Sequence, residues 1–310
     1  MKIAVIGTSE FAMECAQVLI DLNCEVSAMV SLTKEKIPNN SVNIENFAKS
    51  KKIPYYETED INILRCTSFL SELDLDFILS FWPHIILENL LTIPKFGIIG
   101  THPTNLPRNK GRHPLHWLIV LGKKKSMMSF FKMNEVIDGG DILIQEQFDV
   151  GKDINEANSQ MIDAGKKGLE KLIKLLKEKP NYIGNTIQKE SGNYLRKRDI
   201  HDITIDPRMT SNVIKKIVNS FCYPYPLARL YYQKNSFLKI IKINELSDDE
   251  CSRNWKDYEH GYIFKVNHNS IDIRVDNMVL NMEIEVNNID VKILLEKKIH
   301  PPAYYFNSDS

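Results

Sequence analysis

The chain has 310 residues, with 43% hydrophobic and 26% charged side chains, an ordinary composition for one large or two modest globular domains that excludes a disordered chain, collagen and a coiled coil. Lysine plus arginine and aspartate plus glutamate both number 40, so the formal charge is zero and the whole chain offers no field to hold a polyanion such as tRNA or duplex DNA. The longest apolar runs are far shorter than the roughly 20 residues that span a bilayer, and no membrane segment is expected.

The first hundred residues alternate short β-branched runs with amphipathic helical patterns. This alternation is typical of a parallel sheet wrapped by helices. We predict strands at 2–6, 23–30, 53–56, 77–81 and 98–101, and place 77–81 at the centre of the sheet because it is fully apolar. Ser9 is expected to cap the first helix, and further helices are expected at 42–51 and 85–91, with a turn at 38–41.

From Gly100 onward a long loop rich in turn formers and charge precedes an apolar helix at 115–121. Loops of this length in a compact domain are usually functional. Strands are expected at 129–133 and 142–148, with a turn rich in Asp and Gly between them. A capping box of Asp153 and Glu156 predicts the start of a long amphipathic helix that ends before Pro180.

A second region with a different pattern of apolar and polar residues follows the polar stretch 189–206. Its pattern predicts a helix at 213–221 and short strands at 230–232, 237–243, 261–266, 271–275 and 278–286. The sequence therefore predicts an α/β fold, a mostly parallel Rossmann-like sheet with helices on both faces, followed by a small antiparallel β domain of OB-like type. We expect a first domain at 1–188, a linker at 189–205 and the β domain at 206–310.

The common catalytic motifs are missing from the sequence. After the first strand the text is Gly7-Thr8-Ser9, without the G-x-G-x-x-G that cradles a dinucleotide pyrophosphate, so a nicotinamide dehydrogenase is disfavoured. No phosphate loop, H-E-x-x-H zinc pair or G-x-S-x-G nucleophile elbow is found either. Five scattered cysteines without a C-x-x-C pair argue against a disulfide framework and a zinc site, and favour a reducing, cytoplasmic setting.

Two residues remain as chemical candidates. His102 follows the strand at 98–101, at the carboxyl end where open α/β sheets place their ligands. Asp138 stands in the turn Asp138-Gly139-Gly140, whose glycines let the backbone approach a ligand closely. A histidine held by a carboxylate acts as a general base or, once protonated, stabilises an oxyanion. Taken singly, each residue also has a structural interpretation, as a loop histidine and as a turn-forming aspartate.

The text around these two residues resembles the folate-dependent formyltransferases. "GIIGTHPTNLPRNKGRHP" from 97 and "MNEVIDGGDIL" from 133 are similar to that superfamily's N-x-H-P-S-x-L-P-x-x-R-G and D-x-G-x-D-x-G. "VIGTSEFA" and "FWPHIILENLLTIPKFG" are similar to its opening strand and its A-Y-G-x-I-L-P segment. "YLRKRDIHDITID" and "IVNSFCYPYPLARL" resemble the start of the carboxyl-terminal β domain of methionyl-tRNA and sugar formyltransferases, so the resemblance covers most of the chain.

Carried over by position, His102 matches the catalytic histidine of this superfamily and Asp138 its catalytic aspartate. The superfamily's asparagine, two residues before the histidine, is replaced here by Gly100. Either Thr101, Asn105, backbone N–H groups or water supplies the missing donor, or the chain works without it, or it is a weakened enzyme. An active variant is favoured because the rest of the loop is intact.

The resemblance implies 10-formyltetrahydrofolate as the formyl donor and requires no metal. The pterin-binding stretch of the superfamily corresponds to 81–87, with Ile86 as an apolar wall and the turn at 134–138 on the other side. Trp82, Ile86, Asp138 and Gly139 are therefore the expected cofactor contacts. Trp82 has an alternative role, in which it only packs between a strand and a helix.

The expected acceptor is a nucleotide-linked amino sugar. Neutral charge gives little support for a tRNA track, and a purine-pathway transformylase is normally a single shorter domain. "PNNSVNIENFAKSKKIPYYE" and the loop after 100 look closest to the sugar-formylating branch, which modifies 3- or 4-amino sugars on dTDP or UDP for bacterial surface polysaccharides such as the lipopolysaccharide O-antigen. Thr104, Arg108 and Lys110 are the candidate substrate contacts; loop charges that merely face solvent are the alternative for the two basic residues.

The remaining expectations concern partners and the other possible functions. We expect no nucleic-acid or membrane partner, a cytoplasmic location, and a homodimer that forms through strands of the second domain. A methionyl-tRNA formyltransferase stays open, and so does a catalytically silent folate-binding homologue, which Gly100 suggests. The sequence leaves undecided the sugar, the ring position of the amine and the base of the nucleotide.

Overall fold

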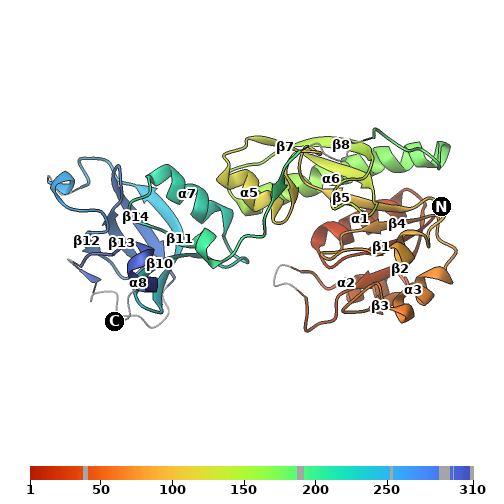
Figure 1. Cartoon of the computed structure of the whole chain (residues 1–310), viewed down its shortest axis with the longest axis horizontal. Coiled ribbons are helices and arrows are strands. Elements are labelled where there is room, and N and C mark those ends of the chain that lie inside the picture. The colour runs from red at the N-terminus through yellow and green to blue at the C-terminus, as the bar shows by residue number, and fades with distance from the viewer. Residues whose placement is uncertain (38–40, 187–191, 252–253, 286–293, 296, 308–310) are drawn as a thin grey trace. The chain divides into compact units, whose positions relative to one another are not determined.

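The computed structural model describes residues 1–37, 41–186, 192–251, 254–285, 294–295 and 297–307 (Figure 1). The chain divides into two compact units. The first comprises Met1–Leu115, Lys124–Gly151 and Glu156–Lys197, and the second comprises His116–Lys123, Lys152–Asn155 and Arg198–Ser310. The domains expected at 1–188 and 206–310 remain a prediction. Part of the expected linker at 189–205, most of the turn at 38–41 and the end of the strand at 278–286 lie outside the described residues.

A seven-stranded sheet forms the centre of the first unit. Its strands are β1 (Lys2–Ile6), β2 (Glu25–Ser31), β3 (Tyr55–Glu57), β4 (Phe77–Ser80), β5 (Ile98–His102), β7 (Lys125–Lys132) and β8 (Ile142–Asp149). They lie in the order β3-β2-β1-β4-β5-β7-β8. The first five are parallel, and β7 and β8 join antiparallel to them. The predicted mostly parallel sheet is confirmed, with the apolar strand β4 in its middle.

Helices connect these strands. They are α1 (Glu10–Asp21), α2 (Ile44–Ser50), α3 (Leu64–Ser71), α4 (Glu88–Leu91), α5 (Pro114–Val120) and α6 (Ile154–Glu178). Ser9 caps α1 as predicted, because its side chain accepts a hydrogen bond from the Ala12 N–H at 3.3 Å. The helix predicted at 85–91 begins only at Glu88. The Leu87 N–H is bonded instead to the side chain of Asn62 at 2.9 Å, which holds the backbone before Glu88 outside the helix.

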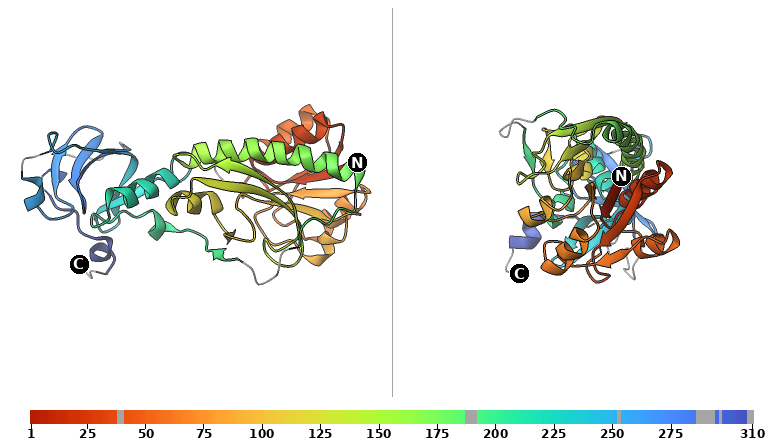
Figure 2. Two further views of the ribbon diagram at one scale, coloured as in Figure 1. Left: turned by 90° about the horizontal axis from the view of Figure 1, so that it is seen from above. Right: turned by 90° about the vertical axis from the view of Figure 1, so that its right-hand side faces the viewer.

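Helices lie on both faces of this sheet. On one face, Cys66 and Leu70 of α3 and Leu90 of α4 join a buried cluster with Ala4 and Ile78 of the sheet. On the other face, the long helix α6 approaches so closely that Gly165 meets the ring of Phe11 in α1 and Gly168 meets the ring of Phe130 in β7. Figure 2 shows α6 as the long green helix along the strands of this unit. The two-sided cover makes the sheet interior a dry core.

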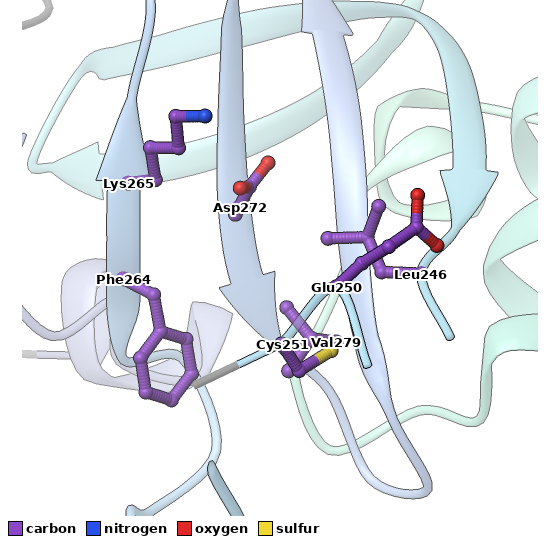
Figure 3. A pocket seen from close by; sticks show the side chains of 7 residues that line it. All are labelled: Leu246, Glu250, Cys251, Phe264, Lys265, Asp272 and Val279. Atoms are coloured by element: carbon purple, nitrogen blue, oxygen red, sulfur yellow. The ribbon is translucent and has the colours of Figure 1, made fainter. Parts of the chain in front are cut away.

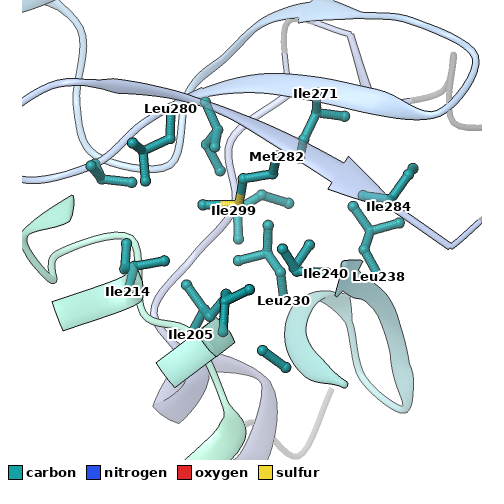
Figure 4. Packing of buried hydrophobic residues seen from close by; sticks show 14 of the residues in the cluster. Ile205, Ile214, Leu230, Leu238, Ile240, Ile271, Leu280, Met282, Ile284 and Ile299 are labelled. Carbon is teal, nitrogen blue, oxygen red and sulfur yellow. The ribbon is translucent and has the colours of Figure 1, made fainter. Parts of the chain in front are cut away.

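The second unit contains a five-stranded antiparallel sheet. Its strands are β10 (Ala228–Gln233), β11 (Ser236–Glu245), β12 (Ile263–Val266), β13 (Ser270–Arg274) and β14 (Val279–Ile284), in the order β10-β11-β14-β13-β12. The helices α7 (Ser211–Ser220) and α8 (Pro302–Asn307) and the short 3₁₀ turns η1 (Ile200–Ile203) and η2 (Trp255–Asp257) complete it. Alternating apolar residues such as Ile271, Ile273, Leu280 and Met282 are buried in one core (Figure 4). The predicted antiparallel β region is confirmed.

Three elements of the first unit are absent from the sequence-based prediction. One is α3, and the other two are the short strands β6 (Lys110–Gly111) and β9 (Tyr194–Leu195), which pair in parallel. The two strands have two residues each, too few to show any alternation of apolar and polar side chains. No helix within the described residues is both long enough and apolar enough to cross a membrane.

The central strand β4 gives a test of this architecture. Ile78 is fully buried in the cluster beneath α3 and α4, whereas Leu64 of α3 is 81% exposed. Ile78→Ala is expected to lower the free energy of unfolding by about 2–5 kcal/mol. Leu64→Ala, the matched control, is expected to change it by less than about 0.5 kcal/mol. Urea unfolding measures both values, and equal effects would contradict the assigned core.

Candidate active site

His102 is the last residue of β5, and its imidazole is held from both sides. The ring is 6% exposed. Nε2 lies 2.9 Å from the carbonyl oxygen of Asn109, and Nδ1 lies 3.5 Å from Oδ2 of Asp138. A carbonyl oxygen only accepts hydrogen bonds, so Nε2 must carry a proton and donate it to Asn109. The structure therefore brings together the two residues that the sequence singled out as chemical candidates.

Asp138 sits in a tight turn between β7 and β8. Its backbone is in the left-handed region, with φ 49°, and its side chain is 15% exposed. Oδ2, the atom that faces His102, also accepts the Gly111 N–H at 2.8 Å. A Cβ at Gly140 would lie 1.7 Å from the carbonyl oxygen of Lys132, so only glycine allows this turn. The turn thus fixes the carboxylate between a backbone donor and the imidazole.

A polar network beneath the loop supports the histidine. In the β5–β7 pairing His102 lies opposite Ser129, which is fully buried. The Ser129 hydroxyl donates to the Thr104 carbonyl at 2.6 Å and accepts from Gln145 at 2.8 Å. Thr104 is fully buried, and its own hydroxyl donates to the Arg108 carbonyl at 2.9 Å. The predicted substrate contact Thr104 therefore lies inside the loop in this structure and holds its shape.

The basic residues of the loop differ in exposure. Arg108 and Arg112 are exposed. Lys110 is fully buried, with Nζ 5.4 Å from the centroid of the Tyr194 ring and without a hydrogen-bond partner within the described residues. Of the two basic residues predicted to contact substrate, Arg108 is placed at the surface and Lys110 beneath an aromatic ring.

Gly100, which the sequence resemblance aligns with the superfamily's asparagine, has little free space beside it. A Cβ at Gly100 would lie 2.7 Å from Cζ of Phe131 and 2.8 Å from Cγ of Met133. Phe131 belongs to a small apolar cluster with Leu106, against which Met133 packs. A donor side chain at this position has no room. Thr101 alternates to the opposite face of β5 from His102, whereas Asn105 is exposed on the loop.

The residues expected to contact a cofactor lie at the apolar cluster under α4 and in the turn that contains Asp138. Ile86 is buried in the cluster under α4, and Trp82 is half-buried against the same cluster. Nε1 of Trp82 is a buried donor without a partner within the described residues. Gly139 lies in the Asp138 turn, where a Cβ would be 2.4 Å from the Val136 side chain. Trp82 thus packs against this cluster with its indole N–H buried and unpaired within the part of the chain that the structure describes.

The structure contains further candidate features outside this site. A cavity of about 230 Å³ lies in the second unit, lined by Leu246, Glu250, Cys251, Phe264, Lys265, Asp272 and Val279 (Figure 3). Burial and the nearby Asp248 raise the pKa of the Cys251 thiol, so this cysteine is not an activated nucleophile. The described residues include no group of three or more histidine, cysteine or acidic side chains placed to hold a metal ion.

A histidine–carboxylate pair at the carboxyl end of a Rossmann-like sheet is an arrangement that suits general acid–base chemistry. A family model described as "Formyl transferase" matches residues 1–173, more than half of the 310 residues. The chain belongs to the formyl transferase family. The backbone groups at Asn109 and Gly111 that hold the pair escaped sequence analysis, because main-chain contacts leave no side-chain signature.

The names of individual relatives specify different molecules that receive the formyl group, methionyl-tRNA in some and a sugar in others. A methionyl-tRNA formyltransferase of Prochlorococcus marinus (strain AS9601) is 28% identical over an alignment 337 positions long, gaps included, which covers 100% of both chains. The crystal structure of WlaRD, a sugar 3N-formyl transferase with dTDP and 5-N-formyl-THF, is 18% identical, with a TM-score of 0.64 and coverage of 93% of this chain and 99% of that one. An N-formyltransferase of Helicobacter canadensis with folinic acid and dTDP-3-aminofucose is 15% identical, with a TM-score of 0.64 and coverage of 92% and 100%. The two structures show a shared fold.

The packing around Gly100 gives a direct test. Gly100→Asn is expected to destabilise the protein by about 1–3 kcal/mol, because its Cβ collides with Phe131 and Met133. Adding Met133→Ala should recover part of that loss by removing one of the two colliding side chains. Thermal unfolding of the wild type, the single variant and the double variant measures this. A single variant as stable as the wild type would show that the space is not filled.

Proposed function

We propose that this chain moves the formyl group of 10-formyltetrahydrofolate to the amine of a nucleotide-linked amino sugar, with His102 and Asp138 as catalytic residues. The observation that carries the proposal is the imidazole of His102 between the Asn109 carbonyl and the Asp138 carboxylate. Family membership supports the reaction class. The finer choice of acceptor rests on charge and on the loop after His102.

The protonation chemistry of the pair suits formyl transfer. With Nε2–H donated to Asn109, a neutral His102 directs the lone pair of Nδ1 at the Asp138 carboxylate, which is itself an acceptor. A proton placed between Nδ1 and Oδ2 converts this repulsion into a charge-assisted contact. A proton taken from the substrate can therefore be held between Nδ1 and Oδ2. An amine that attacks a formyl carbon must lose one proton, and His102 and Asp138 together can receive it.

The second requirement of the reaction is to stabilise the oxyanion that forms on the formyl carbon. Protonated His102 supplies positive charge, and its low exposure strengthens that charge's effect. Asp138 orients the ring, and the proton lost by the amine passes to N10 of the folate as the bond between N10 and the formyl carbon breaks and tetrahydrofolate leaves. The Gly100 position contributes no side chain, so we assign the remaining stabilisation to His102 and to backbone N–H groups of the loop.

The chain also has features suited to the formyl donor. The bound folate supplies the formyl group. The unsatisfied Nε1–H of Trp82 suits an acceptor atom of a pterin ring, and Ile86 suits its apolar face. Gly139 lets the turn backbone approach the ring closely. We therefore retain Trp82, Ile86, Asp138 and Gly139 as the proposed cofactor contacts.

The charge distribution supports a sugar nucleotide as acceptor. Lys+Arg and Asp+Glu are equal at 40, so the chain lacks the positive excess that holds tRNA phosphates. Exposed Arg108 can meet a diphosphate, with Arg112 next along the loop. Contacts from Thr104 and Lys110 remain predictions that require the loop to open. The expected dimer and cytoplasmic location belong to the same proposal.

Methionyl-tRNA is the second candidate acceptor. The observation that favours it is the 28% identity to a methionyl-tRNA formyltransferase over the full length of both chains. Methionyl-tRNA, like an amino sugar, presents an amine to the formyl carbon, so His102 and Asp138 would serve both reactions. A distinguishing property is salt dependence, because phosphate contacts to tRNA release counterions.

Catalysis by the pair is tested by substitution. His102→Ala is expected to lower kcat about 10²- to 10⁴-fold, and Asp138→Asn about 10²-fold, because each removes one proton-transfer partner. Initial rates of formyl transfer from 10-formyltetrahydrofolate measure both. Asp163→Asn, an exposed carboxylate on α6, is the control and should leave the rate unchanged. A His102→Ala enzyme within tenfold of wild type would refute the assignment.

The acceptor is identified by offering the wild-type protein 10-formyltetrahydrofolate with a panel of UDP- and dTDP-linked 3- and 4-amino sugars, or with methionyl-tRNA. Mass spectrometry is expected to detect the gain of one CO on a sugar nucleotide, at a rate that varies little with salt. Formylation of methionyl-tRNA alone, with a steep fall at higher salt, would replace the sugar proposal by the second candidate. Folate binding without turnover of either acceptor would favour a silent homologue.

A further inference from the structure

Two backbone groups of one short loop hold both catalytic side chains. The Asn109 carbonyl accepts from His102 Nε2 at 2.9 Å, and the Gly111 N–H donates to Asp138 Oδ2 at 2.8 Å. Asn109 is the residue before β6, and Gly111 is the last residue of β6, so the two groups are two residues apart. A displacement of this stretch therefore moves the imidazole and the carboxylate together. Displacements of about 1 Å at reacting groups cost on the order of 10²-fold in rate.

The loop has hydrogen bonds of its own, from the Thr104 hydroxyl to the carbonyls of Arg108 and Asn109, but its backbone is strained at Asn109. Asn109 has φ 60°, in the left-handed region that a residue other than glycine occupies at a cost of about 1–2 kcal/mol. Arg108 and Arg112 on either side are exposed. Contacts from elsewhere in the chain can offset this cost.

Asn193, 84 residues further along, supplies these contacts. Its Oδ1 accepts the Asn109 N–H at 3.0 Å, and its Nδ2 donates to Asn109 Oδ1 at 3.1 Å. Its own carbonyl accepts the Lys110 N–H at 2.9 Å. Asn193 thus makes three hydrogen bonds, two to Asn109, which contacts His102, and one to Lys110, which precedes the Gly111 that contacts Asp138.

The approach of the two segments is too close for side chains at two points. A Cβ at Gly111 would lie 2.4 Å from the Leu195 carbonyl oxygen, and a Cβ at Gly192 would lie 1.8 Å from the Pro107 carbonyl oxygen. Both glycines have positive φ, 103° and 95°. The Arg112 N–H donates to the Leu195 carbonyl at 2.9 Å, which continues the pairing of β6 with β9. The fit between the segments is therefore specific in its backbone geometry.

We propose that Asn193 is a positioning residue for formyl transfer: it fastens the catalytic loop so that Asn109 and Gly111 hold His102 and Asp138 at their working distance. This inference rests on the proposed function of that pair. Asn193 contacts neither catalytic side chain, so it acts only through the loop. Loss of its side chain leaves the loop anchored at β9 by backbone bonds and leaves the Asn109 carbonyl its contacts with His102 and with the Thr104 hydroxyl at 3.3 Å, but it removes both bonds that fix the N–H and the side chain of Asn109.

The experiment compares Asn193→Ala, Asn193→Asp and the control Asn219→Ala. Asn219 also makes a long-range side-chain amide bond to backbone, to the Lys152 carbonyl at 3.0 Å, but in the second unit. Asn193→Ala is expected to lower kcat about 10- to 100-fold, with KM for the formyl donor changed less than about threefold. Asn193→Asp keeps the acceptor for the Asn109 N–H and should lose less. A kcat equal to that of Asn219→Ala, or a change in KM alone, would overturn the proposal.

A second measurement reads the same contact without turnover. In ¹⁵N-labelled protein, the His102 imidazole signals are assigned by their loss in His102→Ala. Asn193→Ala should shift the Nε2 signal, because the bond to the Asn109 carbonyl changes, while Asn219→Ala should not. An unshifted signal would refute the positioning role even if the wild type proved inactive. An inactive wild type with a shifted signal would instead count against the proposed function and leave the positioning contact supported.

Discussion

One ring nitrogen of His102 is bonded to a carbonyl oxygen, and the other faces a carboxylate oxygen. These contacts form only if three separate segments of the chain keep fixed positions relative to one another. The end of β5 supplies the histidine, the following loop supplies the Asn109 carbonyl, and the turn between β7 and β8 supplies Asp138. Sheet pairing fixes the first and third pieces relative to each other, since β7 is bonded directly to β5. The loop is the piece that the sheet does not fix. Its position depends on contacts from Ser129 beneath it and Asn193 beside it.

Backbone proximity, more than side-chain packing, sets the geometry of these pieces. Gly140 passes so close to the Lys132 carbonyl, and Gly111 so close to the Leu195 carbonyl, that no Cβ fits at either position. Asp138 and Asn109 both lie at positive φ, a conformation that aspartate and asparagine tolerate better than most residues. These positive-φ positions thus lie next to the His102–Asp138 pair and are held by hydrogen bonds from neighbouring elements.

Some parts of this structure can be predicted from the sequence and others cannot, depending on whether their residues form a recognisable pattern. β1, β4 and β5 each contain a run of apolar residues that is buried on both faces of the sheet. Such runs can be recognised in the sequence without any knowledge of the fold. His102 and Asp138 could be singled out because they stand in segments that resemble the motifs of a known family, and the structure brings their side chains together. Asn193 could not, because one polar residue in a polar stretch has no pattern, and its contacts form only when the segment around β9 pairs with β6. For α3, the mean hydropathy is low and Leu64 faces outward at its start, which obscures the apolar stripe of Cys66 and Leu70.

The surroundings of Gly100 bear on whether the site is a damaged version of the family pattern or a variant of it. Loss of an asparagine side chain by itself leaves a cavity, and cavities in close-packed interiors are costly. Here the space beside Gly100 is occupied by Phe131 and Met133, which pack with Leu106, a residue of the catalytic loop itself. The apolar cluster therefore fills the space beside Gly100 with contacts that support the loop after His102. Under the proposed function, residue 100 then offers no side-chain donor, and stabilisation of the oxyanion would depend on His102 and on backbone N–H groups.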